Sequence, residues 1–137
     1  MRLFSLLIVI ASLIFSGYAF AEEEEKEGEE AKKEVAYYSL RPDLVANIKG
    51  KRSKFARCAI QLMTTQKERI EDIELHTPAL RHALLLLLSE QTGKTLKTQE
   101  GKEKFRQEAL AAVQGVIEEQ TGAPIVENLF FTSFFVQ

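Results

Sequence analysis

Few side chains in this sequence have the type and spacing that catalysis or metal binding requires. His76 and His82 lie six residues apart, about 240° around a helix, so they do not form the i, i+4 pair that binds a metal ion. His82 and Ser89 would share a helix face but lie about 10 Å apart along its axis, which disfavours a hydrolase that uses both. We expect both histidines to serve in packing or at the surface.

Cys58 is the only cysteine, so no intrachain disulfide is possible. It lies at an inward position of an expected strand, where a free cysteine behaves as a small, unreactive apolar residue. The acidic residues within 71–74 have Lys67 and Arg69 nearby, which is typical of a solvated helix face. No phosphate-binding loop is predicted, because three glycines are isolated from one another: Gly50, Gly93 and Gly101. The sequence therefore predicts no enzyme, no cofactor and no metal site.

The element that organises the chain is a helix expected over residues 77–91. Thr77 is predicted to cap its first turn, and Pro78 suits the first helical position, where no N–H partner is needed. Thr92 and Gly93 are expected to end it, with Gly93 in the left-handed conformation. Five residues form an apolar face that must pack against a sheet or another helix: Leu80, Ala83, Leu84, Leu87 and Leu88.

Leu85 and Leu86 lie outside this face and widen the apolar surface of the helix. Burying two leucines is worth on the order of 3 to 6 kcal/mol, so leaving both exposed on a soluble monomer risks aggregation. We predict that they belong to an interface between copies of the chain. The alternative is that residues 66–75 fold back and cover them within one subunit.

Residues 1–21 are predicted to engage a membrane, because Arg2 is followed only by uncharged residues as far as Ala21. The pattern fits a signal peptide, since Ala19 and Ala21 provide a small-x-small site for cleavage after Ala21. It also fits an uncleaved anchor formed by residues 3–21, since about 20 residues span a bilayer and Arg2 would hold the short end inside. On either interpretation, the remainder of a bacterial chain lies outside the inner membrane.

Residues 22–34 contain eight glutamates and three lysines but no apolar stripe. We expect them to form a flexible acidic tether. The residues after it carry 14 basic and 12 acidic side chains, and this near balance does not indicate nucleic-acid binding. About a hundred residues remain for folding, enough for one domain with an apolar core.

Residues 35–137 are expected to form an α+β domain. Strand composition occurs over 35–40, over 44–48 after an interruption at Pro42, and over 54–65 after a basic turn at 49–52. The strand over 54–65 alternates, with four inward positions: Ala56, Cys58, Ile60 and Leu62.

The second half of this domain is expected to be mainly helical. A charged helical segment covers 66–75, and a short connection or small strand covers 94–97. An amphipathic helix is predicted over 98–120, stopped by Gly122 and Pro124. Residues 125–137 are apolar on both faces, as in a central strand that is covered twice. The predicted order is β-β-α-α-β, with helices packed on a small mixed sheet and no internal repeat.

Four short motifs occur in order along residues 38–137. They are Tyr38-x-Leu40-x-Pro42 with Asn47, Pro78-x-x-Arg81 with the leucine run and Ser89, Glu100-Gly101-Lys102, and Leu129-Phe130-Phe131-Thr132-Ser133-Phe134-Phe135-Val136-Gln137. None is specific alone, but together and in this order they resemble the flagellar basal body-associated proteins of the FliL family. The resemblance covers nearly all of the chain after the tether.

The resemblance implies a single-pass inner-membrane protein whose periplasmic domain is similar to the stomatin (SPFH) type of fold. Such a protein would form a homo-oligomeric ring around the ion-driven stator of the flagellar motor, with basal body proteins as partners. It would support flagellar rotation, swimming or swarming, and chemotaxis. The resemblance implies no catalysis and no small-molecule substrate.

The sequence departs from the family at its start. Family members carry a longer cytoplasmic tail and a fuller membrane helix, whereas only Met1 and Arg2 precede the apolar run here. The family pattern favours an anchor, while cleavage after Ala21 would leave the protein soluble in the periplasm. The alternative function is an exported binding, scaffold or chaperone module of another envelope complex.

Overall fold

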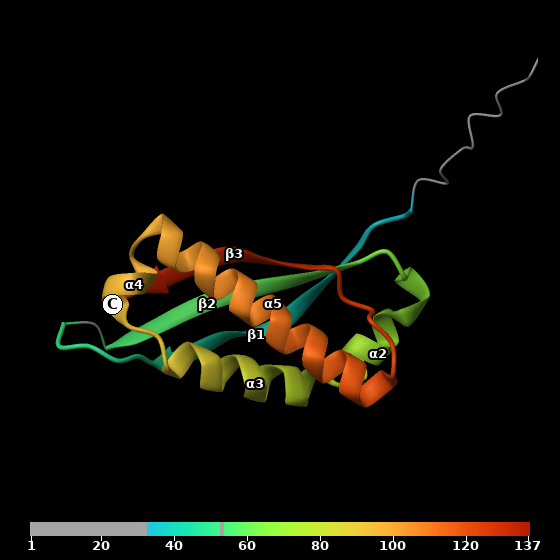
Figure 1. Cartoon of the computed structure of the whole chain (residues 1–137), viewed down its shortest axis with the longest axis horizontal. Helices are drawn as coiled ribbons and strands as arrows, with labels where there is room; N and C mark the ends of the chain where they lie inside the picture. Colours follow the sequence, from blue (N-terminus) through green and yellow to red (C-terminus); the bar gives the residue numbers. More distant parts are fainter. Residues whose placement is uncertain (1–32, 53) are drawn as a thin grey trace, which may run out of the picture. The chain divides into compact units, whose positions relative to one another are not determined.

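Three antiparallel strands form one sheet in the order β1-β2-β3 (Figure 1). The structure is a computed structural model that describes residues 33–52 and 54–137. Their bounds are Ala36–Asn47 for β1, Phe55–Thr64 for β2 and Asn128–Val136 for β3. The expected membrane segment 1–21 and the tether as far as residue 32 lie outside the described residues. Among the residues described, no helix combines the length and hydropathy needed to cross a bilayer.

The α+β class is confirmed, but the prediction of a mixed sheet is wrong. Both strand pairs are antiparallel, with Leu40 opposite Ile60 and Met63 opposite Asn128. The reason lies in the helical connection, which returns the chain to the end of the sheet where β2 finishes. β3 starts there and must run back along β2.

The alternation predicted for the second strand is confirmed. Ala56, Cys58, Ile60 and Leu62 are all buried in the core. The interruption expected at Pro42 appears as a shift in register between Leu40 and Leu44, within one continuous strand. Proline has no N–H to donate, so a bulge at this position preserves the pairing on either side.

Helices cover one face of the sheet (Figure 1). A short 3₁₀ turn η1 (Lys67–Arg69) leads into α2 (Ile70–Leu75), and α3 (Thr77–Ser89), α4 (Gly93–Leu96) and α5 (Gln99–Thr121) follow. The helix predicted over 98–120 is confirmed almost to the residue, with the Thr98 hydroxyl accepting a hydrogen bond from the Gly101 N–H as its cap. Gly122 ends it in the left-handed conformation, with φ of 74°.

The predicted ends of the central helix are wrong in detail. Thr77 lies inside the first turn, where its hydroxyl bonds the Ile73 carbonyl and the Tyr38 hydroxyl instead of capping the helix. α3 ends at Ser89, and Gly93 is the first residue of α4 and not a left-handed cap. The strand considered for 94–97 is instead this short helix, because the Thr92 hydroxyl accepts from the Thr95 N–H and starts a new turn.

The terminal strand is at the edge of the sheet, so the prediction of a central strand covered twice is also wrong. Phe131 and Phe134 pack inward against Phe105 of α5, with ring centroids 5.4 and 6.2 Å from its own. Phe130 and Phe135 lie on the opposite face, where they are 37% and 52% exposed. One face of the strand is apolar because it packs on α5, while the other belongs to the face of the sheet that no described helix covers.

Gly101 allows close contact between α4 and α5. A Cβ atom at this position would lie only 2.0 Å from the carbonyl oxygen of Thr95, far inside van der Waals contact. The chain therefore turns from α4 into α5 with backbone against backbone, which only glycine permits.

Candidate functional site

Leu85 and Leu86, the predicted interface residues, have different environments on α3. Leu85 is partly buried against the core, whereas Leu86 is 55% exposed. Residues 66–75 therefore do not hide Leu86 within the described part of one subunit. Its apolar side chain is available to another molecule.

The structure does not assemble a catalytic set from His76, His82 and Ser89. The Ser89 hydroxyl donates to the Leu86 carbonyl of its own helix at 2.7 Å, and His82 is exposed on α3. Within 33–52 and 54–137, no group of three or more histidine, cysteine, aspartate or glutamate side chains is arranged to hold a metal ion.

Cys58 lies on the inward face of β2 and is completely buried. Burial raises the pKa of its thiol to about 12, and the Asp43 carboxylate adds to this effect. At neutral pH the thiol is protonated and enclosed, so it is not a nucleophile.

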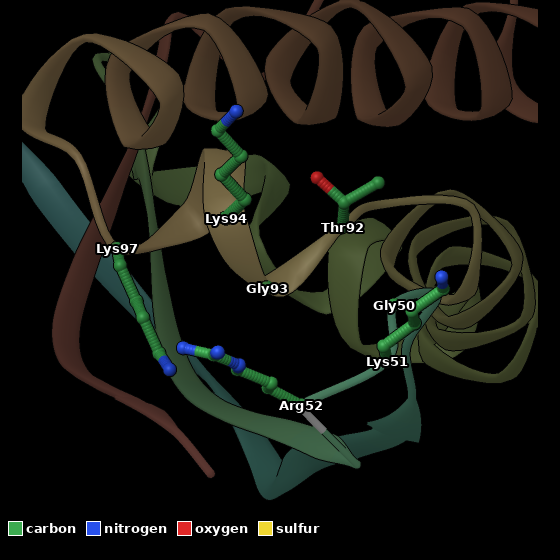
Figure 2. Close-up of a pocket in the computed structure, with 7 residues that line it drawn as sticks. All are labelled: Gly50, Lys51, Arg52, Thr92, Gly93, Lys94 and Lys97. Atoms are coloured by element: carbon green, nitrogen blue, oxygen red, sulfur yellow. The ribbon is translucent and has the colours of Figure 1, made fainter.

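A basic pocket at one end of the sheet was not predicted. It has a volume of about 360 Å³ and is lined by Gly50, Lys51, Arg52, Thr92, Gly93, Lys94 and Lys97 (Figure 2). Arg52 and Lys51 come from the connection between β1 and β2, while Lys94 and Lys97 come from α4 and its end. We call these four cations and the space between them the basic pocket.

Backbone contacts hold the two sides of the basic pocket together. The Lys49 N–H donates to the Gln91 carbonyl at 2.9 Å, and the Gly93 N–H donates to the Lys49 carbonyl at 3.2 Å. Gly50 follows with φ of 134°, a conformation that glycine adopts without strain, and turns the chain toward Lys51. These bonds make a short parallel bridge between segments that lie far apart in the sequence.

Like charges face each other across the basic pocket. In Figure 2 the side chains of Arg52 and Lys97 extend toward one another, and Lys51 and Lys94 point away from its centre. None of these four cations belongs to the ion pairs formed among the described residues. An arrangement of unpaired cations can bind carboxylates or phosphates, but it offers no general base or nucleophile.

A second hollow of about 480 Å³ adjoins the basic pocket and shares Lys94 with it. It contains Glu100 and Lys104, so its charge is mixed. With Lys94 it has two lysines against one glutamate, so its excess of positive charge is smaller than that of the basic pocket.

The basic turn at 49–52 is evident in the sequence, but its partners on α4 are not. Lys94 and Lys97 lie about 40 residues later, and no periodic pattern connects them with Arg52. Their proximity depends on the bridge between Lys49 and Thr92, a long-range contact that local sequence patterns do not encode.

Motifs that are separate in the sequence meet in the structure. Arg81 of α3 donates a hydrogen bond to the carbonyl oxygen of Pro42 in β1. Lys102, at the start of α5, lies over the ring of Phe134 in β3, with its ammonium 5.4 Å from the ring centroid. The residues that suggested a family resemblance therefore make mutual contacts that join helices to sheet.

Comparison with known proteins identifies the family. A sequence model described as flagellar basal body-associated protein FliL matches residues 37–137. The chain belongs to the FliL family. The FliL match begins within β1 and includes every later helix and strand, together with the basic pocket.

A curated FliL relative supports this assignment. The flagellar protein FliL of Aquifex aeolicus (strain VF5) is 29% identical over 101 residues, which is 73% of this chain. The aligned region spans 60% of the length of that relative. The similarity therefore lies in a shared FliL domain.

Proposed function

We propose that this FliL-family chain is a non-enzymatic accessory protein of the bacterial flagellar basal body. The family match over the whole described domain is the observation that carries this function. In this proposal, residues 1–21 anchor the chain in the inner membrane, 22–34 tether it, and 35–137 form a stomatin-like domain in the periplasm. The protein associates with the stator and supports rotation, swimming or swarming, and chemotaxis.

The proposal includes a ring of identical subunits around the stator. Leu86 supports this part, because a leucine that is 55% exposed on an ordered helix is apolar surface that a neighbouring subunit can cover. Leu85 lies next to it and would complete the contact. Identical head-to-tail contacts close into a ring when the rotation between subunits permits.

A complementation experiment tests the function and the interface together. A strain that lacks the gene should lose motility, wild-type protein should restore it, and stator subunits should co-purify from membranes. Leu86→Glu should give a folded protein of smaller assembled size that restores motility poorly, because a charge at the interface opposes association.

Leu84→Glu is the matched control, since Leu84 is completely buried and a charge there should unfold the domain. Unchanged motility in the deletion strain would instead support another envelope complex. If Leu86→Glu leaves the assembled size unchanged, this helix face is not the interface.

A further inference from the structure

We propose that the basic pocket binds the acidic segment 22–34 of a second copy of the chain. This inference rests on the proposed function, because a ring places copies beside one another. It adds a second, electrostatic contact to the apolar contact of α3.

Charge complementarity is the first argument. Four cations without an acidic partner among the described residues line the basic pocket. Arg52 and Lys97 extend toward each other, while Lys51 and Lys94 point away from its centre (Figure 2). The repulsion between Arg52 and Lys97 is relieved by an anion placed in the pocket. Residues 22–34 carry eight glutamates against three lysines, which is the densest negative charge in the sequence.

The dimensions of the pocket favour carboxylate side chains over a single inorganic ion. Its volume of about 360 Å³ far exceeds the roughly 30 Å³ of one water molecule, so side chains can enter. A guanidinium binds a carboxylate through two parallel hydrogen bonds, which Arg52 can provide. The four glutamates at 22–25 follow one another directly and can supply several carboxylates at once.

Chain length favours a second copy as the source. The chain enters β1 at the end of the sheet where Glu34 pairs with Lys67 at 2.9 Å, and the basic pocket lies at the other end of this strand. β1 has 12 residues and is about 40 Å long. Residues 22–32 span at most about 40 Å when fully extended, so only the first of their glutamates could reach the pocket of their own chain, and the others would fall short.

Carbodiimide cross-linking of the full-length protein tests this contact directly, because the reagent joins a carboxylate to a lysine amine that touches it. Protein labelled with ¹⁵N and unlabelled protein are mixed in detergent, cross-linked and analysed by mass spectrometry. We expect cross-links from glutamates 22–30 to Lys94, Lys97 or Lys51 that join labelled to unlabelled peptides. The Glu34–Lys67 pair should cross-link within one copy and serves as the internal control.

The double variant Arg52→Gln with Lys97→Gln should reduce the mixed-label cross-links to Lys94 and Lys51 at least tenfold, with its thermal midpoint unchanged. A peptide of residues 22–34 should compete for the basic pocket and reduce these cross-links, and raising the salt from 50 to 500 mM should weaken the contact.

Cross-links within one copy only, or equal cross-linking in the variant, would overturn the inference. So would competition by phosphate or by anionic lipid micelles when the peptide fails to compete.

The outcome is separate from that of the proposed function. A chain that supports motility but forms no mixed-label cross-links overturns this inference alone. Cross-links in purified protein, combined with normal motility of the deletion strain, overturn the flagellar function and leave the contact standing.

Discussion

Cys58 is a buried group whose titration differs between the folded and unfolded chain. The core raises the pKa of the thiol from an ordinary value of 9.0 to about 12. Below pH 9 the thiol is neutral in both the folded and the unfolded chain, so the difference in pKa has no effect on stability. Between pH 9 and 12 the unfolded chain loses the proton and the folded chain keeps it, so alkaline conditions favour unfolding.

We therefore expect the free energy of unfolding to fall more steeply with pH in the wild type than in Cys58→Ala. Guanidinium unfolding at pH 8 and at pH 10.5 measures this, and the extra loss in the wild type should be about 2 kcal/mol. Lysine and tyrosine titrations are common to both proteins and cancel in the comparison. Equal slopes would mean that Cys58 is accessible to hydroxide in the folded state.

The inward position of Cys58 could be predicted from alternation in β2, since Ala56, Ile60 and Leu62 share its face. The basic pocket could not be predicted in this way. Arg52 and Lys97 lie in connections without a periodic pattern, and a pair of hydrogen bonds between distant backbone segments brings them together.

At the scale of elements, the contact between α4 and α5 depends on one glycine. Gly101→Ala should destabilise the domain by about 1 to 3 kcal/mol, because its Cβ would collide with the Thr95 carbonyl, which is backbone and cannot rotate away. Thermal or denaturant unfolding measures the change.

Gly115→Ala is the matched control on the same helix, since a Cβ there meets no atom within 4 Å. It should leave stability unchanged or raise it by up to about 1 kcal/mol, through better helix propensity. If the two variants unfold alike, α4 moves aside easily and Gly101 has no special role. The Glu100-Gly101-Lys102 motif would then need another explanation.

The helix α5 was predicted more reliably than the role of the last strand. α5 repeats apolar side chains at helical spacing and has a capping threonine and a terminating glycine, so its bounds are local properties. β3 is apolar on both faces, but its inward rings pack on Phe105 while Phe130 and Phe135 lie on the open face of the sheet. Composition alone does not distinguish such an edge strand from a central one.

For the whole molecule, the acidic tether connects membrane attachment with assembly in the proposed arrangement. We expect its length and charge to matter more than its order, because flexible segments act through composition. A version of residues 22–34 scrambled at equal composition should restore motility to a deletion strain. A version with glutamine in place of every glutamate should not, because it cannot engage the basic pocket.

Swimming speed and protein level, measured together, check this prediction. Failure of the scrambled segment at a normal protein level would show that a specific docking sequence lies within 22–34. Full rescue by the glutamine version would show that the segment is only a spacer.

The position of β3 in the sequence also affects how the chain folds. β1 and β2 can pair early in folding, because only a short connection separates them, whereas residues 65–127 lie between β2 and β3 and delay their pairing. During this interval the second edge of β2 has no strand beside it, and unpaired edges join readily to other chains. We therefore expect the chain to be most prone to misassembly in the interval before α5 and β3 complete the sheet.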